Sequence, residues 1–292
     1  MKIRKAVFTA AGLGTRLLPA TKAQPKEMLP LVDKPIIQYV VEEAVASGIE
    51  QIIIVTGRGK RAIEDHFDIA FELEYFLSKK GNNGALTEMR QISDLADICY
   101  IRQKAPLGQG HAILVTKYLV GNEPFAVFFA DDIIDSAIPC MKQMMDVYER
   151  YKCAVVAVQE IPREEIARYG VIAAQPIDER IYRVTGFVEK PRPEDAPSNL
   201  GIVGRYILTP EIFDILEKMS PGQDGELWLA DALHQLLERQ AIYGYRFEGS
   251  RYDTGNKLGY LKATVEYALK RSDLGEEFLA YLRGLDLGEA KK

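Results

Sequence analysis

The segment from Val7 to Pro30 constrains this chain most, because a strand-like stretch runs straight into a long loop rich in turn-forming residues. Ala6–Ala11 is apolar and has the length of a buried strand. Gly12-Leu13-Gly14-Thr15-Arg16 follows, and its two glycines allow a tight turn and the close approach of a ligand. About twenty residues separate this turn from the next expected helix, whereas an ordinary strand-to-helix loop needs only about two to six. Long loops at the carboxyl ends of strands in α/β sheets are common ligand sites.

The residues of this loop indicate an anionic ligand. Backbone N–H groups in a glycine turn attract anions, and Arg16 and Lys26 add two permanent cations. The turn lacks the Gly-Lys-Ser/Thr of a Walker A loop. Leu17 stands where a dinucleotide fingerprint needs its third glycine, which disfavours a NAD-dependent oxidoreductase. Taken alone, the turn could be an ordinary strand-to-helix connection, but the whole stretch predicts a polyphosphate cradle.

Composition excludes several function classes. The 292 residues suffice for one large domain, 47% are hydrophobic, and the formal net charge of -5 argues against a nucleic-acid or membrane surface. The basic N-terminus lacks a convincing signal-peptide cleavage site, so we expect a cytoplasmic protein. Cys99, Cys140 and Cys153 have no zinc-ligand spacing and fit a reducing compartment. Of the three histidines, we expect only His111 near the ligand.

The order of elements predicts an α/β fold. We expect a Rossmann-like, mixed but mainly parallel sheet flanked by helices, with a β-rich lobe and C-terminal helices. We expect one domain over 1–292, with a first half over about 1–150 and a second half over 151–292. The expected strands are 6–10, 51–56, 98–102, 125–130, 153–159, 171–175, 180–188, 201–208 and 242–247. The expected helices are 36–47, 64–78, 110–119, 138–148, 227–239, 256–270 and 273–285.

Some local expectations are more specific. Leu258, Leu261, Val265 and Leu269 should form the buried stripe of the helix over 256–270. Residues 79–84 (KKGNNG) should form a polar turn or mobile loop. The charges of the turn over 56–60 should be solvated, and Asp135 or Ser136 should cap the helix over 138–148.

Several motifs in combination resemble bacterial UTP–glucose-1-phosphate uridylyltransferases, which are sugar nucleotidyltransferases. The string AAGLGTRLLPATKAQPKEMLPLVDKPIIQYVVEEA is similar to their signature, and its Pro-Lys-Glu-Met-Leu-Pro element points to the uridylyl branch. Further matches occur, in order, at 103, 106–112 (PLGQGHA), 128–133 (FFADDI), 169–170 (YG), 188–191 (VEKP), 199–206 (NLGIVGRY) and 252–263 (YDTGNKLGYLKA). The resemblance covers essentially the whole chain. It implies one nucleotidyltransferase domain over 1–292, with a nucleotide-binding half over about 1–150 and a sugar-phosphate-binding and C-terminal helical half over 151–292, where the β-rich lobe binds the sugar.

The resemblance implies a role for each motif in transfer of uridylyl from UTP to glucose 1-phosphate, which gives UDP-glucose and pyrophosphate. The implied catalytic residues are Arg16, Lys26, Asp131 and Lys190. The implied nucleotide-binding residues are Ala11, Gly12, Gly14, Thr15, Glu27, Gln103 and Gly108. Asp132, Gly170, Glu189 and Lys190 should bind the sugar phosphate, and Asp131 with Asp253 should hold Mg²⁺. The resemblance also implies a homo-oligomer, a dimer or a tetramer.

Alternatives remain at the level of sequence. Asp131, Asp132 and Asp253 could instead be helix caps, and Glu189 and Lys190 could be solvated charges at the end of a hairpin. The chain could be a sibling thymidylyl or guanylyl transferase, or a sugar-nucleotide sensor without turnover. Trp228 and Ala230 stand where the resembling family commonly has Gln and Thr, which puts oligomer packing or pocket shape in doubt.

Overall fold

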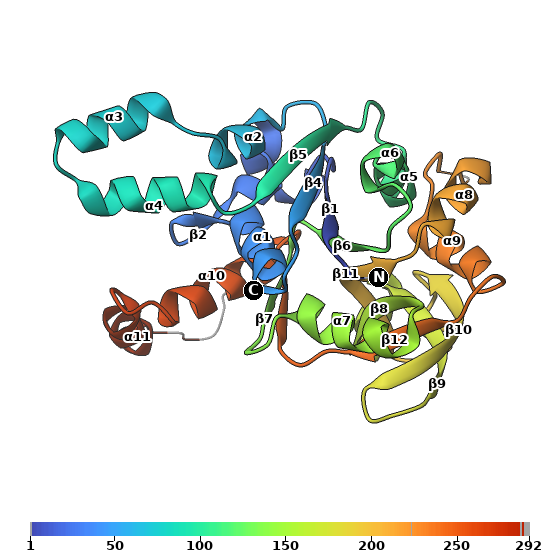
Figure 1. Ribbon diagram of the computed structural model, residues 1–292. Helices are drawn as coiled ribbons and strands as arrows, with labels where there is room; N and C mark the ends of the chain where they lie inside the picture. Colours follow the sequence, from blue (N-terminus) through green and yellow to red (C-terminus); the bar gives the residue numbers. More distant parts are fainter. Residues whose placement is uncertain (1, 223, 287, 289–292) are drawn as a thin grey trace.

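A single mixed sheet organises the molecule in the computed structural model, which describes residues 2–222, 224–286 and 288. Its strand order is β5-β4-β1-β6-β11-β8-β12-β10-β9 (Figure 1). The strands are β1 Lys5–Ala10, β4 Gln51–Thr56, β5 Asp97–Arg102, β6 Phe125–Phe129, β8 Ala154–Glu160, β9 Gly170–Pro176, β10 Ile181–Glu189, β11 Leu200–Leu208 and β12 Ile242–Arg246. Within this sheet only β10 and β11 run against the others, which confirms the predicted mixed, mainly parallel α/β architecture.

Helices cover both faces of the sheet, and this explains why the central strands are continuously apolar. One apolar cluster joins the sheet to α1 (Ile36–Ala46), α2 (Arg61–Phe67) and α7 (Cys140–Tyr151). The other joins it to α5 (Gly108–Leu114), α8 (Glu211–Lys218) and α9 (Leu229–Leu236). Neighbouring central strands also pack laterally, as Phe8 of β1 stacks on Phe128 of β6 with ring centroids 4.8 Å apart.

Two expected helices are each divided in the structure. The predicted helix over 64–78 is wrong as a single element, because α2 ends at Phe67 and α3 runs from Phe71 to Lys79. α2 is held to the core by Ile63 and Phe67, whereas α3 buries no residue and forms a projecting hairpin with α4 (Asn83–Ser93; Figure 1). α4 was not predicted, and the expected polar turn over 79–84 is reduced to 80–82. The expected helix over 110–119 is likewise divided into α5 and α6 (Lys117–Val120).

The C-terminal helices α10 (Lys257–Leu269) and α11 (Gly275–Gly284) lie beside the sheet (Figure 1). The predicted apolar stripe of α10 is wrong, because Leu258 and Leu261 are 62% and 59% exposed. Ala263 and Ala268 are buried instead. Small side chains let this helix approach closely, and a count of large apolar residues overlooks that face.

A second, two-stranded sheet was missed by the sequence analysis. β7 (Asp132–Asp135) pairs antiparallel with β13 (Ser250–Asp253), and the register sets Asp132 opposite Asp253. Asp135 therefore lies in a strand, and the residue before α7 is Pro139, so the expected cap at Asp135 or Ser136 is wrong. β7 and β13 lie more than a hundred residues apart in the sequence. Their pairing brings the acidic segments that contain Asp132 and Asp253 together.

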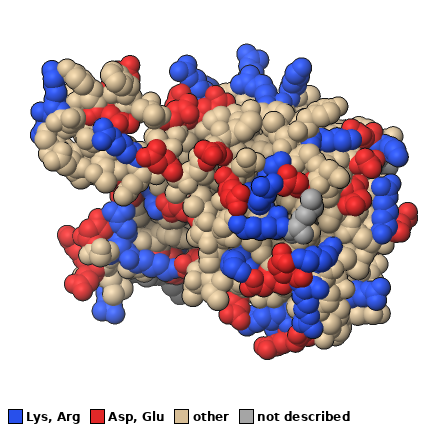
Figure 2. Space-filling model, viewed as in Figure 1, with Lys and Arg blue, Asp and Glu red and all other residues tan. Residues whose placement is uncertain are grey.

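Shorter elements complete the described chain. They are β2 (Pro30–Leu31), β3 (Lys34–Pro35), and the 3-10 helices η1 (Thr15–Leu17), η2 (Ala20–Lys22), η3 (Lys26–Met28) and η4 (Arg163–Arg168). On the face shown in Figure 2, basic and acidic side chains are interspersed. Within the described residues, none of the helices combines the length and the apolar character needed to cross a membrane.

Candidate active site

A cavity of about 580 Å³ lies at the carboxyl ends of β1 and β6 and extends to the ends of β10 and β13. Residues from both halves of the chain therefore line this one cavity. The residues predicted from sequence that line it are Ala11, Gly12, Gly14, Thr15, Arg16, Lys26, Gln103, Gly108, Asp131, Asp132, Gly170, Glu189, Lys190 and Asp253. Of the predicted set, only Glu27 does not belong to this lining.

The glycine turn folds over the loop that carries Lys26. Gly14 has a φ of 70°, and a Cβ there would come within 3.3 Å of Lys26 Cβ and 3.2 Å of Thr21 Cγ2. Both the left-handed backbone and the close packing therefore favour glycine. Thr21 Oγ1 donates to the carbonyl of Gly14 at 2.7 Å and closes the turn. Arg16 is exposed, lines the cavity and forms no ion pair with any described carboxylate.

Lys26 and Asp131 form an ion pair at the centre of the cavity. Burial by itself would lower the pKa of Lys26, but the Asp131 and Glu27 carboxylates outweigh it and the pKa is raised. Burial would raise the pKa of Asp131, but the Lys26 ammonium outweighs it and that pKa is lowered. Both groups are therefore charged near neutral pH.

Asp131 and Asp253 converge on the space beside Gly255. A Cβ at Gly255 would lie 2.6 Å from Asp131 Oδ2 and 3.1 Å from Asp253 Oδ1, so only glycine leaves this space open. The turn is fixed because Thr254 Oγ1 donates to the Asp131 carbonyl at 2.6 Å and Gly255 N–H donates to Asp253 Oδ1 at 3.0 Å. Hard carboxylate oxygens around one cradle fit a divalent cation. Within the described residues no third His, Cys, Asp or Glu joins them.

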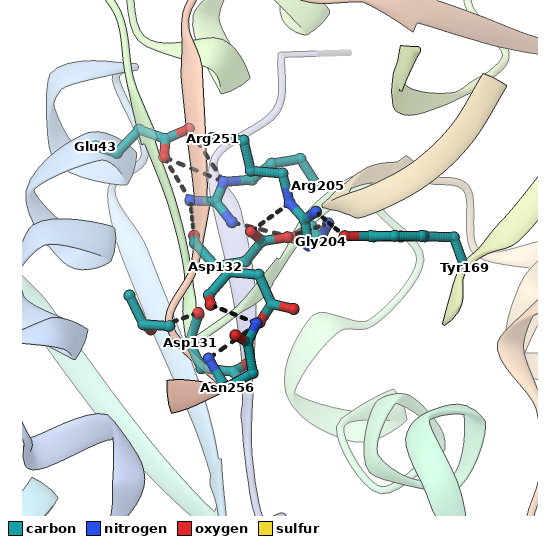
Figure 3. Close-up of polar contacts among 11 residues, drawn as sticks. Glu43, Asp131, Asp132, Tyr169, Gly204, Arg205, Arg251 and Asn256 are labelled. Carbon is teal, nitrogen blue, oxygen red and sulfur yellow. Dashed lines mark hydrogen bonds and ion pairs between the residues drawn. The ribbon is translucent and has the colours of Figure 1, made fainter. Parts of the chain in front are cut away.

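Asp132 has a different environment from its neighbour (Figure 3). Its Oδ2 accepts from the backbone N–H of Gly204 at 2.8 Å, and its Oδ1 accepts from Arg251 Nε at 2.6 Å. Arg251 Nη1 also donates to the Tyr169 hydroxyl at 3.2 Å. Burial alone would lower the pKa of Arg251, yet Asp132 raises it, so the pair remains ionic. Through Arg251, Asp132 thus helps to fix the position of Tyr169 in the cavity wall.

The other end of the cavity carries Glu189 and Lys190 at the end of β10. Lys190 Nζ lies 3.3 Å from Glu189 Oε1, and the Lys190 N–H donates to the Tyr169 carbonyl at 3.1 Å. A Cβ at Gly170 would lie 3.0 Å from Glu189 Oε2, so glycine makes room for that carboxylate. Burial raises the pKa of Glu189, and Lys190 opposes this only in part.

Gln103 and Gly108 form the remaining corner. Gln103 is 7% exposed, and its Nε2 donates to the Gly108 carbonyl and to His111 Nδ1, both at 3.0 Å. Burial lowers the pKa of His111, which favours the neutral, accepting ring. His111 was expected near the ligand, but it is absent from the cavity lining and orients Gln103 from behind.

Comparisons with known proteins agree with this geometry. The family model for nucleotidyl transferases matches residues 5–270. A UTP–glucose-1-phosphate uridylyltransferase of Staphylococcus epidermidis is 54% identical over 98% of this chain and 99% of its own. The chain belongs to this uridylyltransferase branch of the nucleotidyl transferase family. The UDP-glucose pyrophosphorylase structure complexed with UDP-glucose has a TM-score of 0.85 at 48% identity, covering 92% of this chain and 100% of that one. The UTP-bound UGPase of Acinetobacter baumannii has a TM-score of 0.91 at 41% identity, covering 97% and 99%.

Glu27, which the family resemblance assigns to nucleotide binding, is buried and does not line the cavity. Its side chain is 0% exposed, Oε2 accepts from Lys60 Nζ at 2.7 Å, and Oε1 has no hydrogen-bond partner among the described residues. Lys60 is itself buried, so the expectation of solvated charges over 56–60 is wrong for Lys60, although Arg58 is exposed. Burial raises the pKa of Glu27 against the opposing effect of Lys60. The pair anchors the backbone next to Lys26 and does not reach the cavity wall.

The sequence analysis also missed a buried arginine that supports the site. Arg205 is 0% exposed, donates through Nη2 to Glu43 Oε2 at 2.6 Å and through the same nitrogen to the Asp132 carbonyl at 2.7 Å (Figure 3). Glu43 Oε1 also accepts from the N–H of Met141 in α7 at 3.2 Å. One signal was available: an arginine inside the apolar strand segment LGIVGRYIL must be paired if buried.

Proposed function

We propose that this chain transfers the uridylyl group of UTP to glucose 1-phosphate, giving UDP-glucose and pyrophosphate. An oxygen of the sugar phosphate attacks the α-phosphorus, the bond to the bridging oxygen of pyrophosphate breaks, and pyrophosphate leaves. The observation that carries the proposal is the single cavity that joins the Arg16–Lys26 loop to Lys190 across Asp131. Because no protein nucleophile is needed, positioning and charge stabilisation suffice.

The donor side follows from the glycine turn. Backbone N–H groups from Ala11 to Thr15, with Gly12 and Gly14 among them, bind the phosphates of UTP. Arg16 and Lys26 stabilise the charge that develops on the leaving pyrophosphate. Gln103 and the backbone at Gly108 bind the uracil edge; because Gly108 and His111 engage the Nε2 hydrogens of Gln103, its Oε1 remains to accept from the uracil N–H. Glu27 contributes by anchoring the Lys26 segment through Lys60.

The acceptor side follows from the end of β10. Lys190 binds the phosphate of glucose 1-phosphate, and Glu189 accepts hydrogen bonds from the sugar hydroxyls. Gly170 allows the close approach of the sugar, and Asp132 supports this wall through Arg251 and Tyr169. Residues 1–150 then serve mainly the nucleotide, and residues 151–292 mainly the sugar phosphate.

The metal is proposed to be Mg²⁺, held by Asp131 and Asp253, whose oxygens converge beside Gly255. When bound there it supplies electrostatic screening between the two phosphate-bearing substrates. Phosphate and water oxygens would complete its coordination. We further propose a cytoplasmic homo-oligomer, a dimer or a tetramer. The three free cysteines support a reducing compartment.

A pyrophosphate-release assay over a panel of nucleotides tests the proposal. With Mg²⁺ and glucose 1-phosphate, UTP should support far faster turnover than ATP, CTP or GTP. TTP is the hardest control, because it differs by one base methyl and one ribose hydroxyl. Equal or faster turnover with another nucleotide would assign the chain to a sibling activity. Binding of UTP without any turnover would instead indicate a sensor.

A further inference from the structure

The one tryptophan of this chain, Trp228, lies against the acceptor lysine. Lys190 Nζ is 4.0 Å from the centroid of the Trp228 ring. An ammonium at this distance is attracted by the negative face of the indole, which is the best aromatic partner for a cation. Both residues line the cavity, so the contact lies within it.

The indole is held in place from two sides. Its Nε1 donates to Asp224 Oδ1 at 3.2 Å, and the same carboxylate oxygen accepts from the N–H of Glu226 at 3.1 Å. Leu227 is buried and exchanges backbone hydrogen bonds with the segment at the start of α5: its N–H donates to Leu107 at 2.8 Å, and its carbonyl accepts from Gly110 at 2.9 Å. The ring therefore has a defined position before any ligand arrives.

The lysine side chain has more freedom than the ring. Its backbone is fixed by the hydrogen bond to Tyr169 and has a φ of 45°, but the side chain is 42% exposed. Glu189 at 3.3 Å and Trp228 are the contacts that draw its ammonium inward. A flexible four-carbon stem without the ring could move into solvent.

We propose that Trp228 is a positioning residue for the acceptor phosphate. Its indole face holds the Lys190 ammonium in the cavity where the phosphate of glucose 1-phosphate binds. A second carboxylate in this place would neutralise the ammonium and repel the phosphate. The indole attracts the cation without cancelling its charge, so the ammonium stays available to phosphate oxygens. This inference rests on the function proposed above.

Steady-state kinetics of ring variants test the positioning. Trp228→Ala and Trp228→Gln should raise KM for glucose 1-phosphate about tenfold, with KM for UTP within about twofold and kcat within about threefold of wild type. Trp228→Phe keeps an aromatic face and loses only the N–H to Asp224, so its KM should stay within about threefold of wild type. Equal losses for both substrates, or a Phe variant as impaired as the Ala variant, would overturn the proposal.

Intrinsic fluorescence gives a second readout that needs no variant. Because Trp228 is the only tryptophan, emission excited selectively at indole reports the surroundings of this one ring. UDP-glucose, titrated without metal, should change the emission, because its distal phosphate draws the ammonium from the ring. UMP lacks that phosphate and should leave the emission nearly unchanged. Lys190→Ala should shift the emission of the free protein and abolish the response.

The outcomes separate this inference from the proposed function. Normal turnover of UTP and glucose 1-phosphate, together with emission that is flat or identical for UDP-glucose and UMP, would overturn the role of Trp228 alone. Absence of turnover and of UDP-glucose binding by calorimetry would overturn both. If the Trp228→Ala protein fails to fold, the wild-type emission still decides the question.

Discussion

Neighbouring residues in this chain can have opposite tasks, as Asp131 and Asp132 do. Asp131 faces Lys26 and the space beside Gly255, whereas both oxygens of Asp132 are already engaged by Gly204 and Arg251. A group that is fully engaged by the protein shapes a site, and a group that faces an open cradle remains available to a ligand. The identity of a side chain therefore matters less here than the direction in which it points.

Asp131→Asn is expected to lower turnover by about 100-fold or more while the protein stays folded. The amide keeps the shape but lacks the negative charge that would hold a divalent cation and pair with Lys26. Activity over a magnesium titration, with thermal melting as the control, measures this. Asp132→Asn is the matched variant, and it should act mainly on KM for glucose 1-phosphate. Wild-type rates for Asp131→Asn at ordinary magnesium would move the metal site elsewhere.

Glu27 gives a prediction for the pH dependence of stability. Its pKa is raised by burial, so its contribution to the free energy of unfolding is fully present below the unfolded pKa of about 4.3 and is lost as pH rises through the folded pKa. Relative to Glu27→Gln, wild type should therefore lose stability as pH rises from the unfolded pKa through the raised folded pKa. Urea unfolding of both proteins over this range measures the difference, and a flat or rising difference would contradict the raised pKa.

Among the elements, β7 and β13 have the largest effect on the site. Each is short, yet their pairing sets Asp132 opposite Asp253 and brings the turn at Gly255 to Asp131. Arg205 in β11 connects this small sheet to α1 through Glu43. These elements hold one another through buried charge as well as through apolar packing.

Arg205→Met should reduce the free energy of unfolding by about 3–5 kcal/mol, because the largely buried Glu43 carboxylate loses its cation. Glu43→Gln combined with Arg205→Met should recover most of this loss, since the amide oxygen can still accept from Met141 and no unpaired charge remains. Chemical denaturation of the two single variants and the double variant measures the coupling. Additive losses would mean that the pair is not the source of the effect.

At the scale of the whole molecule, the two halves share one sheet. β11, from the second half, lies between β6 of the first half and β8, and the cavity takes residues from both. The chain shows no break at which one half could unfold without exposing strands of the other. This continuity positions the donor loop against the acceptor lysine.

We therefore expect one cooperative unfolding transition. Far-UV circular dichroism reports all helices and strands, while Trp228 emission reports one place, where the segment over 224–228 of the second half contacts the start of α5. Coincident denaturation midpoints are expected, because loss of β11 would leave β6 and β8 each without one of its two neighbouring strands. Two separated midpoints would show that the halves unfold independently.

The sequence by itself determined the elements whose causes are local. β4 and α1 were predicted nearly to the residue, because an apolar run and a helical repeat both depend only on residues that are close together in the sequence. The glycine turn was found for the same reason, whereas most candidate site residues were implied by the family resemblance, and of the candidate set all except Glu27 line the cavity. Only the tertiary structure decided which partners those residues have. Glu27 with Lys60, Asp132 with Arg251, and β7 with β13 are contacts between distant segments, and local patterns carry no information about which distant segment will arrive. Burial of α10 through alanines, rather than leucines, likewise depends on how closely its neighbours approach.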